Sequence, residues 1–316
     1  MADVRPFRGL RYDPSKIGEM DRVVSPPYDI ISPSQEESLR QRSPYNVVRL
    51  ELPQREPSDT DDDNRYTRAA SLFGQWQSEG VLVPEETPAM YLVEEEFTYE
   101  GSTWRRHGLT VVVRLEEFEK GIVLPHEFTT PGPKADRLTL MKACRANFSP
   151  IMSLYHDAKG AIAGLLTQVQ RGQPAVTAPP NDTPLGGQAG HKMWVIADSD
   201  LLARISESMA PLQIFVADGH HRYETALQNR DELQASEGVL PPNAAARFMM
   251  MTLISMDSPG LLVLPYHRIV GGLTDVELAA LRRGLDQAFH IQPIEVPPPH
   301  AGVGEVARAI ENELES

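Results

Sequence analysis

Patterns of hydrophobic and polar residues divide the chain into predicted strands and helices. Apolar residues alternate with polar ones from Tyr91 to Tyr99, and a turn at Glu100-Gly101 leads into a second β-rich run over Leu109–Leu115. This arrangement predicts a β-hairpin. Short apolar runs predict buried strands at Met193–Ile196, Ile214–Ala217, Phe248–Met256 and Leu261–Leu264. Helical spacing predicts helices over Tyr66–Gly80, Ser199–Met209, Tyr223–Leu233, Asp275–Phe289 and Gly304–Ser316.

The order of these elements predicts the fold class and the domains. Helices and strands are interleaved without strict alternation, which favours an α+β fold. Residues 170–192 are rich in Gly, Pro, Asn, Thr and Gln and are expected to form a long loop or linker. A chain of 316 residues is long enough for about two domains, or for one domain with a large insertion. We expect one α+β domain over 1–290, with an inserted β-rich segment at about 86–195. A proline linker and C-terminal helix over 291–316 would begin a further, truncated part.

Composition narrows the class of protein. Hydrophobic residues make up 41% of the chain, which excludes wholesale disorder. The net charge of −14 argues against DNA as a partner, because an acidic surface repels phosphates. No apolar stretch reaches the roughly 20 residues of a membrane span, and the polar N-terminus lacks the apolar region of a secretory signal. Cys144 is the only cysteine and is expected to be a small buried residue. We therefore expect a cytoplasmic protein, with a homodimer left open.

The densest chemical motif is Asp218-Gly219-His220-His221-Arg222, where a predicted strand ends and a helix begins. The first turn of a helix offers unpaired N–H groups and a positive dipole, which favour a bound anion. Arg222 adds a planar fork suited to phosphate. Asp218 could bind magnesium or act as a base, or it could simply cap the helix. If Arg222 holds a phosphate from a cleft, its loss should weaken nucleotide binding and leave folding nearly unaffected.

Three further clusters are candidates for the same site. His126-Glu127 could act as an acid–base pair or bind metal. A basic island with Lys134 and Arg137 follows it and could attract small anions, although ordinary surface residues are the alternative. The stiff segment Ser25-Pro26-Pro27 could hold Tyr28 and Asp29 at a pocket rim, or could be only a turn. Near the C-terminus, His267 and Arg268 could form a second anion clamp.

At this point the chain resembles a bacterial and archaeal family long filed as a domain of unknown function. The residues that carry the resemblance are Asp218–Ala226, whose Asp-Gly-His-His-Arg-Tyr-Glu-Thr-Ala sequence is that family's signature, together with Ser25–Ile30, His126–Arg137 and Leu264–Arg268. The family resembles the ParB/sulfiredoxin superfamily, which also contains free serine kinases. The resemblance covers about Pro6 to Val270, and family members usually continue beyond the length of this chain. It implies a ParB/sulfiredoxin-like mixed sheet that binds nucleotide phosphates at Gly219–Arg222.

The same resemblance separates the possible activities. The turn Gly219–Arg222 contains no cysteine, which excludes a sulfiredoxin reaction, and no basic recognition helix follows Ala226. We therefore expect a kinase that transfers phosphate from ATP or ADP, with Mg²⁺, to free serine or a similar amino acid. A metal-dependent hydrolase and a non-catalytic nucleotide-binding switch are the alternatives.

In the kinase hypothesis each candidate residue has a role. The phosphates would be held by Gly219, His220, His221 and Arg222, with help from Lys134 or Arg137. Asp218 or Glu127 would bind magnesium, and the catalytic groups would be Asp218, His221, Glu127 and His126. The substrate would be bound by Tyr28, Asp29, His267 and Arg268.

Overall fold

The computed structural model describes the whole chain except residues 100, 183–187, 264–269, 293–304, 306–309 and 311–316. It consists of two units, Met1–Leu262 and Val263–Ser316. The sequence analysis placed this boundary after residue 290. In the second unit, α9 (Asp275–Ala288) begins at a capping box formed by Thr274 and Glu277.

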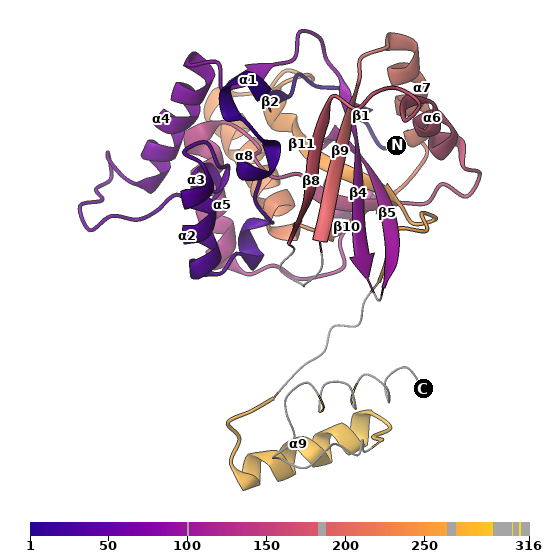
Figure 1. Cartoon of the computed structure of the whole chain (residues 1–316). Coiled ribbons are helices and arrows are strands. Elements are labelled where there is room, and N and C mark those ends of the chain that lie inside the picture. Colours follow the sequence, from indigo (N-terminus) through magenta and orange to yellow (C-terminus); the bar gives the residue numbers. More distant parts are fainter. Residues whose placement is uncertain (100, 183–187, 264–269, 293–304, 306–309, 311–316) are drawn as a thin grey trace. The chain divides into compact units, whose positions relative to one another are not determined.

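A mixed β-sheet forms the centre of the first unit (Figure 1). Within the described residues the sheet has nine strands: eight run in the order β6-β10-β7-β11-β5-β4-β9-β8, and the ninth, β1, pairs with β5. The pairs β10–β6 and β11–β7 are parallel, and the others are antiparallel. The strands are β1 (Val4–Arg5), β4 (Met90–Tyr99), β5 (Ser102–Arg114), β6 (Val123–Leu124), β7 (Ile151–Tyr155), β8 (Val176–Asp182), β9 (Gln188–Ile196), β10 (Ile214–Asp218) and β11 (Phe248–Ser255). A separate small sheet pairs β2 (Leu10–Tyr12) with β3 (Leu82–Pro84).

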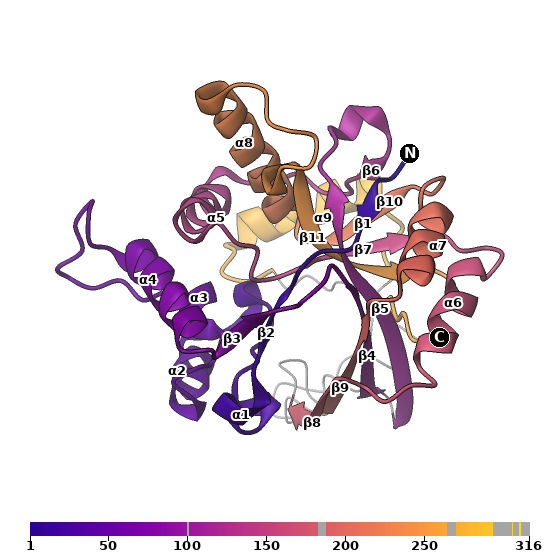
Figure 2. The ribbon, with the colours of Figure 1, turned by 90° about the horizontal axis from the view of Figure 1, so that it is seen from above.

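Helices lie on both sides of this sheet (Figure 2). α6 and α7 pack on one side, while α1 to α4 lie on the other. α5 packs against both α4 and α8. The helices of the first unit are α1 (Pro14–Ile17), α2 (Pro33–Arg42), α3 (Val48–Glu51), α4 (Arg65–Ser78), α5 (Pro131–Cys144), α6 (Ala161–Val169), α7 (Ser199–Met209) and α8 (His220–Glu237).

Side-chain alternation gives the two faces of the sheet different environments. Along β5, Leu109, Val111 and Val113 are fully buried and pack in the core with α6 and α7. Thr110 and Val112 point to the opposite face and are only half-buried. Because successive side chains in a strand point to opposite faces, the sheet has one packed face and one less covered apolar face.

Many of the predicted elements are present. The hairpin forms as β4 and β5, helix α7 has its predicted bounds, and the strand, turn and helix around Gly219 form as β10 and α8. Cys144 and Trp194 are buried. The β-rich segment 86–195 does not stand apart as an insertion, because β4 and β5 lie within the same sheet as β10 and β11.

Two predicted segments differ from the structure. Residues 170–192 were expected to be a loop, yet β8 and β9 cover much of this range. The prolines Pro179 and Pro180 are accommodated because β8 is an edge strand with a register shift between Ala178 and Asn181. Residues 261–263 were expected in a strand but are not, because the chain turns at Pro259-Gly260. The predicted helix over 304–316 lies, apart from residues 305 and 310, outside the described residues.

Candidate active site

The candidate site is built on the sharp turn between β10 and α8. Gly219 adopts φ +100°, a conformation that L side chains rarely adopt. A Cβ at this position would also lie 2.9 to 3.0 Å from the guanidinium of Arg222. The turn therefore requires glycine for two reasons, and it brings the start of α8 directly to the end of β10.

A loop from a distant part of the sequence packs against this turn. The His126 backbone N–H donates to His220 Nε2 at 3.1 Å, and the His126 ring Nε2 donates to the Ala217 carbonyl at 3.0 Å. The Thr130 backbone N–H donates to His221 Nε2 at 3.0 Å. The rings of His126 and His220 meet edge to face, with centroids 4.5 Å apart. The two histidine-containing segments therefore form one cluster.

These hydrogen bonds define the tautomer of each histidine. Nε2 of His220 and of His221 accepts a backbone N–H, so in the neutral ring the proton lies on Nδ1. His126 is the reverse, because its Nε2 faces a carbonyl and must carry the proton. Nδ1 of His126 consequently has a free lone pair, and the side chain is exposed. His126 is thus the histidine of the cluster that can accept a proton without giving up a backbone partner.

Two deeply buried nitrogen atoms at the turn have no hydrogen-bond partner within the described part of the chain. One is His220 Nδ1, in a side chain that is 1% exposed, and the other is Arg222 Nε, in a side chain that is 9% exposed. Glu127 Oε1 lies 3.1 Å from His220 Nδ1, but outside hydrogen-bonding geometry. Burial lowers the pKa of His220, although Glu127 opposes this shift. His220 is therefore neutral near pH 7.

Arg222 is buried, whereas the sequence analysis expected it to face a cleft. Its Nη1 donates to the Pro150 carbonyl at 2.7 Å, and its Nη2 donates to Asp218 Oδ2 at 2.6 Å. These contacts tie α8 to β10 and to the residue before β7. The sequence analysis expected Arg222 to contribute little to folding; because the side chain is buried and connects three segments, we now expect it to stabilise the fold. Asp218 is half-exposed, and its Oδ1 remains available to a ligand.

Arg137 also lies inside the protein. Its guanidinium donates to the Glu51 carbonyl at 2.9 Å and to Asp136, and it lies 4.2 Å from the centroid of the Tyr28 ring. The Arg222 guanidinium lies 5.9 Å from the same ring. Burial raises the pKa of both Tyr28 and Glu51. Tyr28 therefore joins the two arginines in a packed cluster, and the cations of this cluster are largely engaged by the protein itself.

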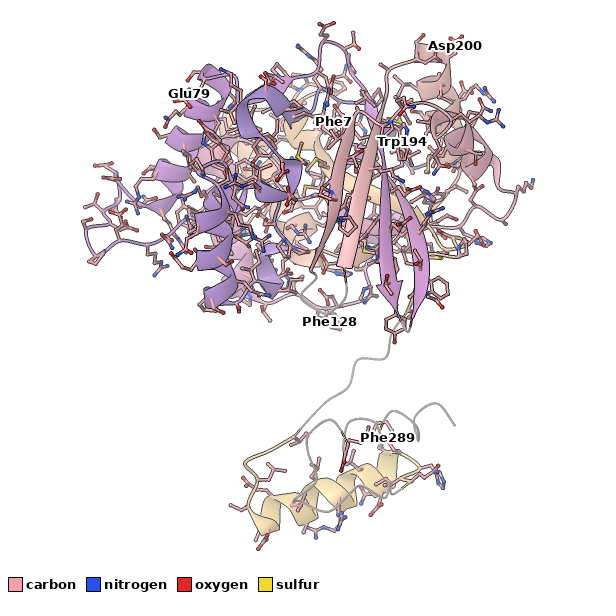
Figure 3. All side chains as sticks on the ribbon, in the orientation of Figure 1. Phe7, Glu79, Phe128, Trp194, Asp200 and Phe289 are labelled. Atoms are coloured by element: carbon pink, nitrogen blue, oxygen red, sulfur yellow. The ribbon has the colours of Figure 1, made fainter. Side chains whose placement is uncertain are left out.

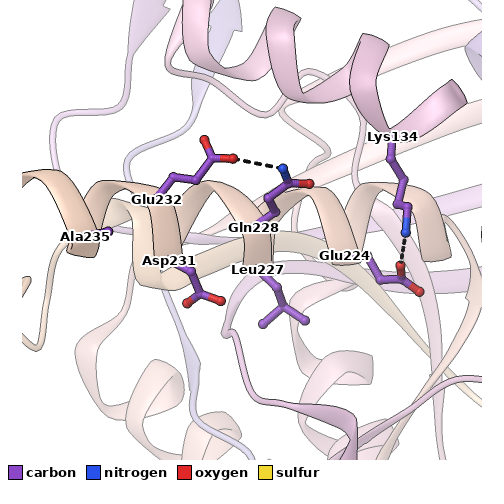
Figure 4. A pocket seen from close by; sticks show the side chains of 7 residues that line it. All are labelled: Lys134, Glu224, Leu227, Gln228, Asp231, Glu232 and Ala235. Carbon is purple, nitrogen blue, oxygen red and sulfur yellow. Dashed lines mark hydrogen bonds and ion pairs between the residues drawn. The ribbon is translucent and has the colours of Figure 1, made fainter. Parts of the chain in front are cut away.

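Lys134 lies at one end of an open groove between α5 and α8 (Figure 4). Its ammonium pairs with Glu224 at 2.7 Å, and Thr129 donates to the same carboxylate oxygen at 2.6 Å. These contacts, together with the charge of Lys134, hold the pKa of Glu224 below its usual value in spite of burial. Glu224 was not among the sequence candidates, although it belongs to the same signature. The Lys134–Glu224 pair fixes the 129–134 segment on α8.

The remaining candidates are Asp29, which adjoins Tyr28, and two residues outside the described part of the chain. Asp29 is exposed on the short turn Tyr28–Ile30. His267 and Arg268 lie outside the described residues. Phe128 is fully exposed on the loop that carries His126 (Figure 3). The sequence analysis overlooked Phe128, although an apolar side chain beside a histidine–glutamate pair is a detectable signal.

Among the described residues, no group of three or more His, Cys, Asp or Glu side chains is arranged to hold a metal ion. Mg²⁺ does not require such a group, because it usually binds through one or two carboxylates, waters and phosphate oxygens.

In the same part of the chain, no helix is long and apolar enough to cross a membrane.

Comparison with known families identifies the chain as a member of an uncharacterised family. The model of the family DUF1015, described as "Protein of unknown function", matches residues 4–312. The chain therefore belongs to this family. No curated protein and no solved structure matches it.

Proposed function

We propose that this DUF1015 protein is a nucleotide-dependent kinase that phosphorylates free serine or a similar small amino acid. The observation that carries the proposal is the convergence of the 126–130 loop on the start of α8. This convergence places two buried nitrogens that lack a hydrogen bond within the described residues, His220 Nδ1 and Arg222 Nε, at the N-terminus of α8, which has no side-chain cap. Buried polar atoms normally have partners, so such atoms at a turn of this kind indicate a missing polar ligand. The choice of serine as the acceptor follows from the resemblance inferred in the sequence analysis.

The residues present fit a magnesium–nucleotide. The N–H groups of His221 and Arg222 lie in the first turn of α8, where a phosphate is favoured by the helix dipole. Asp218 Oδ1 and the Glu127 carboxylate are the exposed oxygens that would bind Mg²⁺. The bound nucleotide would supply the phosphoryl group. Arg222 would contribute through Nε only, because its two terminal nitrogens are already engaged by Pro150 and Asp218.

His126 is the general base in this proposal. Its exposed Nδ1 takes the proton of the acceptor hydroxyl as the hydroxyl oxygen forms its bond to phosphorus. The bond between phosphorus and the leaving phosphate oxygen breaks in the same transfer, and the nucleotide leaves with one phosphate fewer. His220 and His221 hold the 126–130 loop in place through their Nε2 atoms. A positioned base of this kind typically contributes about 10²- to 10⁴-fold to the rate.

The test is direct detection of O-phosphoserine. The purified chain is incubated with L-serine, Mg²⁺ and either ATP or ADP, and the products are followed by ³¹P NMR and mass spectrometry. His126→Gln keeps a side-chain N–H for the Ala217 carbonyl but removes the basic nitrogen, so kcat should fall about 10²-fold or more. His156→Gln is the matched control, since His156 is an exposed histidine at the end of β7 whose partner is Asp257.

The outcomes are distinct. Phosphoserine formation that is lost in His126→Gln and retained in His156→Gln supports both the activity and the base. Turnover that survives His126→Gln overturns the assignment of the base. Failure to phosphorylate serine or any other amino acid hydroxyl with either nucleotide overturns the kinase proposal.

A further inference from the structure

A large cavity lies on the less covered face of the sheet. Its volume is about 930 Å³, and apolar side chains form most of its wall. One side is the sheet, and the other consists of the N-terminal segment 5–12, parts of α3 and α4, and the residues that follow α5. This volume lies within the range of about 300 to 1,000 Å³ that is typical of small-molecule sites.

The sheet side of the cavity carries a strip of mostly apolar side chains from β4, β5, β8, β9 and β11, with Thr110 and Tyr91 between its two ends. Val112 lies opposite Met250 on β11, and Val93 on β4 lies opposite Met193 on β9. Met193 in turn faces Val176 on the edge strand β8. These side chains are only half-buried, whereas their neighbours on the other face pack fully under α6 and α7. Methionine side chains are flexible, so this strip can adapt to the shape of an apolar ligand.

Several polar groups of the cavity wall are already satisfied by the protein. The Tyr91 hydroxyl accepts the Gly9 N–H at 2.8 Å, and the Tyr12 hydroxyl donates to the Tyr45 carbonyl at 2.8 Å. Thr110 bonds to Thr252 across the strands at 2.9 Å. Because these groups already have partners, they offer little to a polar ligand such as a nucleobase or a free amino acid. The interior of the cavity therefore favours an apolar ligand body.

The charged residues of the cavity wall all carry the same sign. Among the described residues, the lining contains arginines and a lysine but no aspartate or glutamate, in a chain of net charge −14. Arg5, Arg11 and Lys192 are neutralised by carboxylates outside the lining. Within the described residues, Arg8 donates only to the Glu85 carbonyl and Arg145 makes no ion pair. Arg8 and Arg145 are both exposed, so two uncompensated cations are available for an anionic group.

From these observations we propose that the cavity is a second ligand site, which binds an amphipathic anion with an apolar aliphatic body and one anionic head group. The body lies along the Val112, Met250 and Met193 strip, and the head group faces Arg8 or Arg145. This site is independent of the kinase proposal, because none of its lining residues belongs to the His126 and His220 cluster. The two proposals can therefore fail separately.

The test is calorimetric titration of the whole chain with decanoate, dodecanoate and dodecanol below their aggregation concentrations. Each buried methylene should tighten binding about fourfold, so dodecanoate should bind about 15-fold more tightly than decanoate. Dodecanol should bind more weakly than dodecanoate. The preference for the carboxylate should disappear when Arg8→Gln and Arg145→Gln are combined. Arg204→Gln, an exposed arginine on α7, is the matched control and should retain this preference.

A cavity-filling variant tests the location. Val112→Phe places a larger side chain on the strip and should weaken dodecanoate binding by about tenfold or more. Val239→Phe, at a residue that is 88% exposed, should not. Circular dichroism and melting curves confirm that the variants fold, and Val93→Phe serves as a second filling variant. Absence of saturable binding, unchanged affinity in both filling variants, or displacement of dodecanoate by Mg-ATP would each overturn the second site.

Discussion

Replacing Arg222 tests whether this residue supports the fold. In Arg222→Ala, the buried hydrogen bond from Nη1 to the Pro150 carbonyl is lost, together with the pair to Asp218. A hydrogen bond from a charged group contributes about 1.5 to 3 kcal/mol. The Asp218 carboxylate is 53% exposed, so solvent screens the ion pair, which contributes at most about 1 kcal/mol. The free energy of unfolding should therefore fall by about 2 to 4 kcal/mol.

Thermal and urea denaturation measure this loss. For a domain of this size, 1 kcal/mol corresponds to roughly 2 to 4 °C in melting temperature, so Arg222→Ala should melt about 5 to 15 °C lower. Arg222→Lys should recover only part of the loss, because an ammonium cannot reach both partners as a planar fork does. Arg204→Ala on the exposed side of α7 should change stability by less than about 0.5 kcal/mol. An Arg222→Ala protein with the same melting temperature and urea midpoint as the wild type would refute a structural role for these contacts.

Four further expectations concern single residues. Gly219→Ala should lower both stability and kinase activity, because it strains φ +100° and places a Cβ within 3.0 Å of Arg222; unchanged melting would contradict this. Phe128→Ala should leave the melting temperature unchanged, since the side chain is fully exposed, and should alter KM for nucleotide or serine if the loop contacts either one. Burial lowers the pKa of His220 in the native protein. Just below pH 6.5 the imidazole is therefore protonated in the unfolded chain but still neutral in the native protein. Stability should therefore be fully present above about pH 6.5, fall below it while the unfolded chain takes up the proton, and level off once the native ring is protonated as well; the slope should be smaller in His220→Gln when urea midpoints are compared. Burial raises the pKa of Cys144 to about 11, so iodoacetamide should not alkylate the native protein at pH 8, and mass spectrometry would reveal any adduct.

Local sequence patterns predicted the helices and strands that are determined by residues close together in the sequence. α7 has an apolar stripe and an Asp198 cap, and its predicted bounds coincide with the observed ones. β10 and the turn at Gly219 were predicted because a short apolar run ends at Asp-Gly. β8 was missed because Pro179 and Pro180 indicate a loop. Prolines are tolerated on an edge strand, and edge position is a property of the sheet that local sequence does not reveal.

The sequence predicted which residues belong to the candidate site better than it predicted how they are arranged. His126 and His220 were both singled out, and the structure brings their rings together. The burial of Arg222 depends on Pro150, a residue with no signal of its own in the sequence. The large cavity was also not predictable, because alternation along β5 shows that Thr110 and Val112 share a face but not how completely that face is covered.

The position of β5 has a consequence for how the protein is made. Its neighbours are β4, which precedes it directly, β1 from the start of the chain, and β11, which ends at Ser255. On a ribosome that adds about 5 to 20 residues per second, roughly 7 to 28 s pass between synthesis of β5 and completion of β11. During this interval one edge of β5 presents unpaired backbone groups between apolar side chains, an arrangement that promotes aggregation. The nascent chain should therefore depend on a chaperone until β11 has emerged.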